Sequence, residues 1–449
     1  MASGNRLLIT NARLVSDGRI AEGDLLVEGD RIARIDAQIG RVAGATVIDA
    51  AGKFLIPGMI DDQVHFREPG LTHKGDLATE SAAAAAGGIT SFMDMPNVKP
   101  LTVTRQALAD KYTLAAGRCT GNYGFYLGAT NDNIDEIRAL EVGEAAGIKA
   151  FMGASTGNML VDDPRTLEAI FAHAPVIVVT HCEDSPTIWA NEAAARQRYG
   201  EDVPFAEHPR IRSTEACLKS STLATGLARR HDALLHVLHL TTAAEMALFS
   251  AAPRSEKRVT AEVCVHHLWF DESRYADLGA AIKCNPAIKR YEDREALLAA
   301  VNDGRIDIIA TDHAPHTRDE KAQTYFKAPA GLPLVQHALL VLFDLAREGR
   351  LAPELIVERA CHAPADIFGV RDRGYLHEGA YADLVLVDPD RPTPVQAKSL
   401  LYKCGWSPFA GHRFSASIDT TIVNGTVAWR DGRLSGAVPG RRLEFTRAR

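Results

Sequence analysis

Residues 175–184 read PVIVVTHCED, an apolar run that gives way to histidine and acidic side chains. A nearly continuous apolar run is typical of a parallel strand buried on both faces. Comparable runs recur along the middle of the chain, at 55–66, 90–95, 122–128, 147–153, 233–240, 259–267 and 307–312. Together they supply the eight strand candidates that a (β/α)₈ barrel requires.

Segments with helical character lie between several of these runs, at 74–88, 133–147, 214–231 and 294–304. An alternation of strands and helices is the pattern of an α/β fold with a parallel sheet. The sequence therefore predicts an α/β protein built on a TIM-like (β/α)₈ barrel.

Both ends of the chain have a different pattern, with short alternating strands separated by Gly-Asp or Asn-Gly turns. RLLITNARLV (6–15) and GDLLVEGDRIARID (23–36) are examples near the start, and SASIDTTIVNGTVAWRDGRL (415–434) is one near the end. We expect residues 1–56 and 373–449 to form the two halves of one small β-sandwich domain, beside a barrel at 57–372.

Composition narrows the class of protein. The 449 residues carry a net charge of −7 without a basic cluster, which argues against a nucleic-acid partner. No signal peptide and no apolar run of about 18 residues is visible, which argues against secretion and a membrane partner. The 7 cysteines include no C-x-x-C pair and fit reduced thiols. We expect a cytoplasmic enzyme that acts on a small molecule.

Metal-capable side chains belong to five strand candidates: His65, His181, His239 and Asp312 end the first, fifth, sixth and eighth, and Lys149 lies in the fourth. Each has an ordinary alternative, since a histidine can be a loop residue, an aspartate a helix cap and a lysine a surface group. In a barrel, however, the carboxyl ends of the strands meet at one rim, where active sites form. Imidazole and carboxylate ligands from several strands are what a catalytic zinc site needs.

The motifs around these residues carry a family resemblance. They are IDDQVHFREPG (60–70), MDMPN (93–97), GIKAFMG (147–153), THCED (180–184), LHLTT (238–242) and ATDHAPH (310–316). Their order and spacing resemble the amidohydrolase superfamily of cyclic amidases, and most closely the dihydroorotases. GAYADLVLVD (379–388) looks like that family's C-terminal strand, so the resemblance spans nearly the whole chain.

The resemblance implies a role for each metal-capable residue. His65 would be a ligand from the first strand, and Lys149 would become carboxylated and bridge two zinc ions. His181 and His239 would bind the second ion, and Asp312 would contact the metal and act as general acid and base. One or two Zn²⁺ ions and a homodimer are the corresponding expectations.

The resemblance also implies a substrate side. Arg67, Asn97 and His316 would hold a substrate carboxylate, for which a guanidinium fork is well suited. Asn285 would bind the amide edge of the ring. The plainer alternatives are a surface salt bridge for Arg67, turn residues for the two asparagines and a loop cap for His316.

One position departs from the family pattern. The first strand of the family carries His-x-His, whereas here Gln63 precedes Val64 and His65. An amide oxygen is a poorer zinc ligand than imidazole. Three outcomes stay open: two ions with one loosely held, one ion held mainly by His181 and His239, or a site filled only by substrate.

The expected reaction is the reversible hydrolysis of L-dihydroorotate to N-carbamoyl-L-aspartate, a step of pyrimidine synthesis. One alternative is another cyclic amidase, of the hydantoinase, dihydropyrimidinase or allantoinase type. The other is a scaffold without catalysis, which the loss of a histidine at Gln63 would favour. His266 and His267, at the end of the seventh strand, are expected to be structural, and His73 a loop residue.

Overall fold

A computed structural model describes residues 6–153 and 159–449 and confirms the predicted α/β barrel. Parallel strands run from the first barrel position to the last, and an isolated bridge between Val64 and His313 joins the two ends. In chain order, the barrel strands are β6 (Met59–Val64), β7 (Ile89–Asp94), β8 (Asn122–Phe125) continued by β9 (Leu127–Gly128), β10 (Ile148–Phe151), β11 (Val178–His181), β12 (Leu235–Val237), β13 (Val259–Cys264) and β14 (Ile308–Ala310). Nearly every residue of these strands is buried, which explains their apolar sequence.

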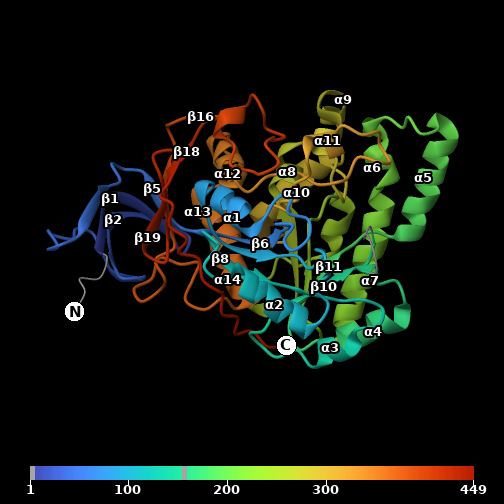
Figure 1. Ribbon diagram of the computed structural model, residues 1–449, viewed down its shortest axis with the longest axis horizontal. Coiled ribbons are helices and arrows are strands. Elements are labelled where there is room, and N and C mark those ends of the chain that lie inside the picture. The colour runs from blue at the N-terminus through green and yellow to red at the C-terminus, as the bar shows by residue number, and fades with distance from the viewer. Residues whose placement is uncertain (1–5, 154–158) are drawn as a thin grey trace.

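Helices surround this barrel, as the centre and right of Figure 1 show. The longer ones are α1 (Leu77–Ala86), α2 (Arg105–Ala115), α4 (Pro164–His173), α5 (Ser185–Tyr199), α7 (Thr214–His231), α10 (Tyr291–Asp303) and α12 (Ala338–Arg347). The shorter ones are α3 (Ile134–Arg138), α6 (His208–Ile211), α8 (Val265–Trp269), α9 (Tyr275–Leu278), α11 (Arg318–Lys321), α13 (Pro353–Val357) and α14 (Ala363–Phe368). No helix in the described part of the chain is both long and apolar enough to cross a membrane.

The helix expected over 133–147 is wrong in its length, because only α3 is helical there. Beyond it, Glu144 accepts a hydrogen bond from the backbone N–H of Glu141 and forms a two-pronged ion pair with Arg105 of α2. Gly143 has a positive φ of 92°. Tertiary contacts thus favour a turn over the helical propensity of the segment.

Strands from both ends of the chain pair in one 9-stranded sheet, seen at the left of Figure 1. Its members are β1 (Arg6–Ser16), β2 (Arg19–Glu28), β3 (Arg31–Asp36), β4 (Thr46–Asp49), β5 (Phe54–Pro57), β15 (Leu384–Asp388), β18 (Ser417–Val423), β19 (Thr426–Arg430) and β20 (Arg433–Leu434). The two ends meet where β5 pairs with β15 in antiparallel fashion. The remaining short strands, β16 (Thr393–Pro394) and β17 (Arg413–Phe414), pair with each other. The boundaries of the composite domain stay a prediction.

A buried polar network joins this sheet to the barrel. Asp383, just before β15, forms an ion pair with Arg373 and accepts hydrogen bonds from the backbone of Asn424 at 2.8 Å and from the side chain of Asn122 at 3.1 Å. Asn122 begins barrel strand β8, and its Oδ1 accepts a bond from Asn424 at 2.7 Å. One carboxylate therefore fixes the sheet against the barrel.

We predict that Asp383→Ala lowers the free energy of unfolding by about 3–5 kcal/mol, because Arg373 would stay buried without its partner. Chemical denaturation with guanidinium measures the change. The control is Asp36→Ala, which removes an exposed carboxylate paired with Arg34 and should leave the midpoint unchanged. Equal midpoints for both variants would contradict a central role for Asp383.

Candidate active site

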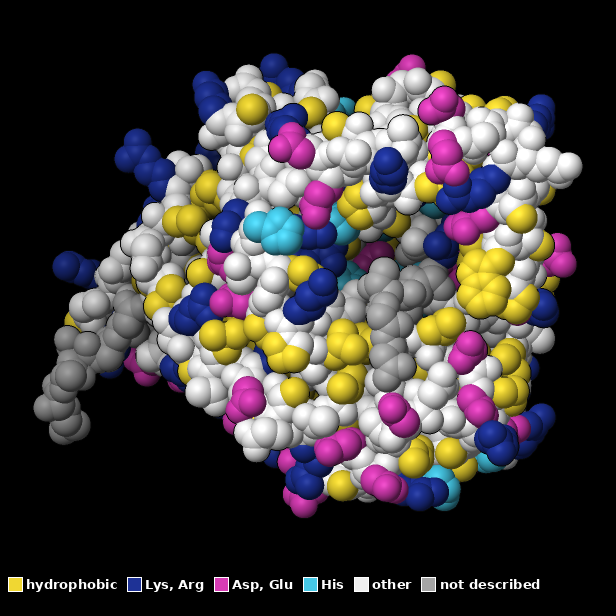
Figure 2. Space-filling model, turned by 45° about the vertical axis from the view of Figure 1, so that its right-hand side comes forward, with side chains coloured by type: hydrophobic (Ala, Val, Ile, Leu, Met, Phe, Trp, Pro, Cys, Tyr) yellow, Lys and Arg dark blue, Asp and Glu magenta, His cyan; other side chains and the backbone are white. Residues whose placement is uncertain are grey.

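The structure gathers the predicted site residues around one cavity of about 100 Å³ at the carboxyl end of the barrel strands. Its wall contains Gln63, His65, Arg67, Asn97, Lys149, His181, His239, Asn285 and Asp312. His316 is the one predicted residue behind this wall, in contact with Arg67. Histidine, lysine and arginine side chains gather around a hollow in the middle of the face in Figure 2.

His181 and His239 form one half of the predicted ligand set. Nδ1 of His181 lies 3.0 Å from Nε2 of His239. The other nitrogen of His181 lies 2.9 Å from Oε2 of Glu183. An ionised carboxylate only accepts hydrogen bonds, so Nε2 of His181 carries the proton and Nδ1 presents a lone pair to the cavity. This is the tautomer that a metal ligand needs.

Glu183 is an ionised acid that fixes this geometry. Burial works against its charge, yet Arg212, 2.8 Å away, and His181 more than offset burial and lower the pKa of Glu183 to about 2. Burial lowers the pKa of His181 and, with the help of His181, that of His239, so both rings are neutral near neutral pH.

His65 and Asp312 form the other half of the ligand set. Nδ1 of His65 donates to Oδ1 of Asn97 at 2.7 Å, which leaves the lone pair of Nε2 facing Oδ1 of Asp312 at 3.0 Å. That oxygen is buried and accepts no well-aligned hydrogen bond from the described residues. Two acceptors this close require a proton or a metal cation between them, so the donor chemistry fits a metal ion.

The charge of Asp312 is compatible with such a site. Burial opposes it, but with a proton between the two atoms the contact with His65, together with the charges of His266 and Lys149, outweighs the burial, and the pKa of Asp312 lies below its ordinary value. Asp312 is thus ionised at neutral pH, available both as a ligand and as an acceptor for a proton.

Lys149 lies between the two halves on β10 and is 1% exposed. Its Nζ lies 4.6 Å from the centre of the Phe151 ring, and no group in the described ranges forms an ion pair or hydrogen bond with it. Burial lowers the pKa of Lys149 to about 8. A substantial fraction of the amine is therefore neutral in the physiological range, as a reaction with CO₂ requires.

Gln63 occupies the position of the missing histidine and is 1% exposed. Sγ of Cys264 approaches its Oε1 at 3.9 Å. The side chain therefore offers a neutral amide oxygen at the cavity wall, opposite a thiol from β13.

Arg67 is buried, and its Nε donates to the carbonyl oxygen of Pro315 at 3.0 Å. Its Nη2 lies 3.0 Å from Nε2 of His316. Lys74 donates to Nδ1 of His316 at 3.1 Å, so Nε2 of this ring carries the proton. The carbonyl oxygen of Ala330 accepts that proton at 3.0 Å, so the Arg67 guanidinium is the donor that remains at the cavity wall, a suitable partner for a carboxylate.

Asn285 contributes a further free polar atom. Its Oδ1 is buried and has no hydrogen-bond partner in the described part of the chain. A buried amide oxygen without a partner is uncommon, and one in a cavity wall is available to a ligand N–H.

Unfavourable backbone conformations accompany these side chains. Arg67, His239 and Asp312 have positive φ values of 71°, 39° and 49°. Such angles are rare for residues other than glycine and cluster at functional sites, where surrounding contacts hold them. The backbone N–H of His239, for example, donates to Oε1 of Glu262 at 3.0 Å.

Gly70 explains why the HFREPG motif ends in glycine. Its φ is 81°, and a Cβ at this position would overlap the carbonyl oxygen of Lys99. The backbone N–H of Lys99 in turn donates to the Pro69 carbonyl oxygen at 3.1 Å. The loop that carries Arg67 therefore packs directly against the loop that carries Asn97.

Sequence reasoning missed three supporting residues: Glu183, Arg212 and Glu262. The sequence offered a signal for the two acids, since Glu183 follows His181 by two residues and Glu262 interrupts an apolar strand. It offered no signal for the residues with which these acids pair. It also assigned Asn97 to the substrate alone, although Asn97 orients His65. His266 and His267 are buried beside the rim and do not line the cavity, as expected.

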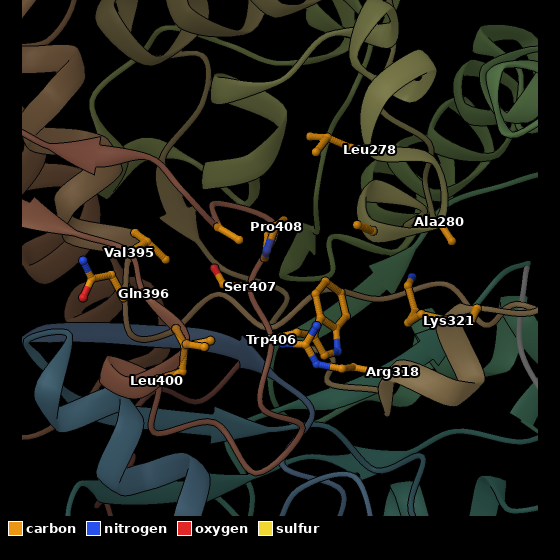
Figure 3. Close-up of a pocket in the computed structure, with 14 residues that line it drawn as sticks. Leu278, Ala280, Arg318, Lys321, Val395, Gln396, Leu400, Trp406, Ser407 and Pro408 are labelled. Atoms are coloured by element: carbon orange, nitrogen blue, oxygen red, sulfur yellow. The ribbon is translucent and has the colours of Figure 1, made fainter.

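A second, more apolar groove of about 390 Å³ lies outside this rim (Figure 3). Leu278, Lys321, Leu400 and Trp406 contribute to its wall, which contains none of the predicted ligands. Nε1 of Trp406 donates to the carbonyl oxygen of His316 at 2.7 Å. Trp406 of this groove therefore anchors the backbone of His316, which lies behind Arg67.

Comparison with known proteins agrees with this geometry. The family model described as "Amidohydrolase family" matches residues 54–428. The chain belongs to the amidohydrolase family. A dihydroorotase of Halobacterium salinarum is 35% identical over 437 residues, covering 96% of this chain and 99% of that protein. A dihydroorotase of Bacillus cereus is 33% identical, covering 94% and 98%.

Solved structures of this amidohydrolase fold include an L-hydantoinase (dihydropyrimidinase) from Arthrobacter aurescens. It superposes with a TM-score of 0.93 at 28% identity, over 98% of this chain and 100% of the other. The barrel and its flanking sheet are thus arranged as in that protein.

We predict that Glu183→Gln weakens metal binding by about 10–100-fold, because the neutral amide no longer fixes the tautomer of His181. Competition with a coloured chelator measures the affinity. Asp184→Asn is the matched control, since Asp184 caps α5 and points to Thr187 and Lys219 instead. An equal affinity for wild type and Glu183→Gln would show that Glu183 does not orient a ligand.

Proposed function

We propose that this amidohydrolase hydrolyses L-dihydroorotate reversibly to N-carbamoyl-L-aspartate in pyrimidine synthesis. The observation that carries the proposal is the buried Arg67 beside His316, in the wall of a cavity that the paired imidazoles of His181 and His239 also line. Dihydroorotate has a carboxylate on its ring, so one small molecule could contact both the arginine and the histidines. The similarity to named dihydroorotases over nearly the full length supports the same substrate.

His181, His239, His65 and Asp312 would hold the Zn²⁺ of this enzyme, one or two ions in number. Bound zinc would lower the pKa of a water molecule and polarise the scissile carbonyl. We propose that neutral Lys149 adds CO₂ to form a carbamate, with loss of one proton, and so becomes an anionic oxygen ligand. Its burial without a counter-ion favours the neutral amine that reacts.

Other residues of the chain bind the substrate and transfer the proton. Arg67, with His316 behind it and Asn97 alongside, binds the substrate carboxylate, and Asn285 accepts a hydrogen bond from a ring N–H. This fixes the ring carbonyl over the histidines, which is the proximity contribution. Asp312 takes a proton from the attacking water and delivers it to the departing ring nitrogen, so one carboxylate serves as base and then as acid.

The rival activity within the family is hydrolysis of a ring without a carboxylate, as the names of the similar solved structures suggest. We predict that Arg67→Ala lowers kcat/KM for dihydroorotate by about 10²–10³-fold, because a buried ion pair with the substrate is lost. Activity toward dihydrouracil, which has no carboxylate, should not fall. Loss of ultraviolet absorbance in zinc-supplemented protein measures both rates.

Two outcomes contradict the proposal. Hydrolysis of hydantoin or dihydrouracil that exceeds that of dihydroorotate would assign the chain to the rival activity. No turnover of any of these rings above a metal-free control would favour a scaffold that has lost catalysis.

We further predict that Gln63→His raises the affinity of the site for a second metal ion, because imidazole replaces an amide oxygen beside His65. Metal titration followed by elemental analysis gives the number of ions and their dissociation constants. Gln63→Asn, which keeps an amide, is the control and should not gain affinity. A second ion bound equally well by wild type and Gln63→His would show that Gln63 already serves as a full ligand.

A further inference from the structure

Beneath the rim, three ionisable side chains meet in the interior of the barrel. Asp62 comes from β6, His236 from β12 and Glu262 from β13, and each is 0% exposed. None of them lines the cavity described above. They form a separate group, which we call the interior cluster.

The atoms of the interior cluster face one another without hydrogen bonds. Nε2 of His236 lies 3.4 Å from Oδ2 of Asp62 and 3.6 Å from Oε2 of Glu262. The three potential ligand atoms all lie within 4.8 Å of one another. None of them, nor Oδ1 of Asp62, has a hydrogen-bond partner within residues 6–153 and 159–449. Buried polar atoms are nearly always paired, so four orphans at one point need an explanation.

The tautomer of His236 strengthens the case. Oγ1 of Thr260 donates to the carbonyl oxygen of Leu235 at 3.3 Å and lies 2.8 Å from Nδ1 of His236. A hydroxyl has one hydrogen, so Nδ1 of His236 carries a proton and donates it to Thr260. Nε2 faces the two acids. Burial works against a charged ring, yet Asp62 and Glu262 outweigh it and raise the pKa of His236 to about 9, while burial and Asp62 raise the pKa of Glu262 to about 8. A cation, either a proton or a metal ion, therefore belongs among these three side chains.

The separations fit a metal better than hydrogen bonds. N–H···O bonds measure about 2.7–3.2 Å, shorter than both distances from His236. Zinc bonds to nitrogen and oxygen are about 2.0–2.2 Å long, which places tetrahedral ligands about 3.3–3.6 Å apart. The observed 3.4 and 3.6 Å match that spacing.

We propose that Asp62, His236 and Glu262 bind a divalent transition-metal ion, Zn²⁺ by geometry, in a second site below the catalytic rim. Two carboxylates and an imidazole are hard and borderline ligands that suit such an ion. Its charge would balance the two acids, which are fully buried. Because the ligands are fully buried, this ion is structural and does not meet the substrate.

Glu262 would connect the two sites. Its Oε2 faces the interior cluster, while its Oε1 accepts the backbone N–H of His239 and a hydrogen bond from Sγ of Cys264 at 3.5 Å. His239 needs this support because its backbone φ is 39°. An ion bound at the cluster would thus fix the carboxylate that holds a rim histidine in place.

The test is a metal count on the full chain, and it does not depend on which substrate is hydrolysed. Zinc-loaded protein is dialysed in the native state against EDTA, which removes ions from the accessible rim. The protein is then unfolded in guanidinium with a coloured chelator. We expect one equivalent of zinc to be released only on unfolding. Release of no zinc at that stage overturns the proposal and leaves a proton, not a metal, among the three side chains.

Variants and diffraction locate the ion. Asp62→Asn and His236→Gln should each lose the equivalent that resists EDTA. Asp61→Asn is the matched control and should retain it, since the neighbouring Asp61 is bonded to Thr311 and lies outside the cluster. If a cluster variant does not fold, anomalous diffraction at the zinc edge from wild-type crystals should show a peak between the three ligand atoms. An interior without such a peak overturns the assignment.

Discussion

Burial of charge is the constraint on which the catalytic rim depends. Ionised groups out of water require partners, and here the partners also set geometry. Glu183 is paired with Arg212, and the same carboxylate fixes the tautomer of His181. Asp94 is paired with Lys111 at 2.7 Å, both almost fully buried, and accepts the backbone N–H of Phe66. These pairs hold the residues next to the ligands in place, because no water can substitute for either partner.

The sequence predicts the barrel, and it picks out side chains that the structure gathers around one cavity, for a physical reason. Strands buried on both faces must be apolar, so polar residues at their ends stand out, as at His181 and Asp312. What it could not predict depends on contacts between distant segments. Asn97 orients His65 across 32 positions of the chain, and Glu262 holds His239 across 23. The turn after α3 was missed for the same reason, since Arg105 and Glu144 lie on different elements.

The two halves of the rim are not equivalent. On one side, His181 and His239 are both neutral imidazoles, and Glu183 fixes the tautomer of the first. On the other side, His65 is oriented by Asn97, but its neighbour Gln63 offers only an amide oxygen, near a thiol. Because imidazole is a better ligand for a transition metal than an amide is, the half with two histidines would be the stronger metal site. The loss of one histidine thus weakens one half and leaves the other intact.

Glu262 connects the interior of the barrel to the half of the rim that contains His181 and His239. A carboxylate has two oxygens, and here one supports the left-handed backbone of His239 while the other faces Asp62 and His236. If the proposed ion is bound there, the position of His239 would depend on how the interior charges are balanced. A rim histidine in an unfavourable backbone conformation keeps its place only while the group behind it is rigid. Neutralising two buried acids with one cation would supply that rigidity without lining the cavity.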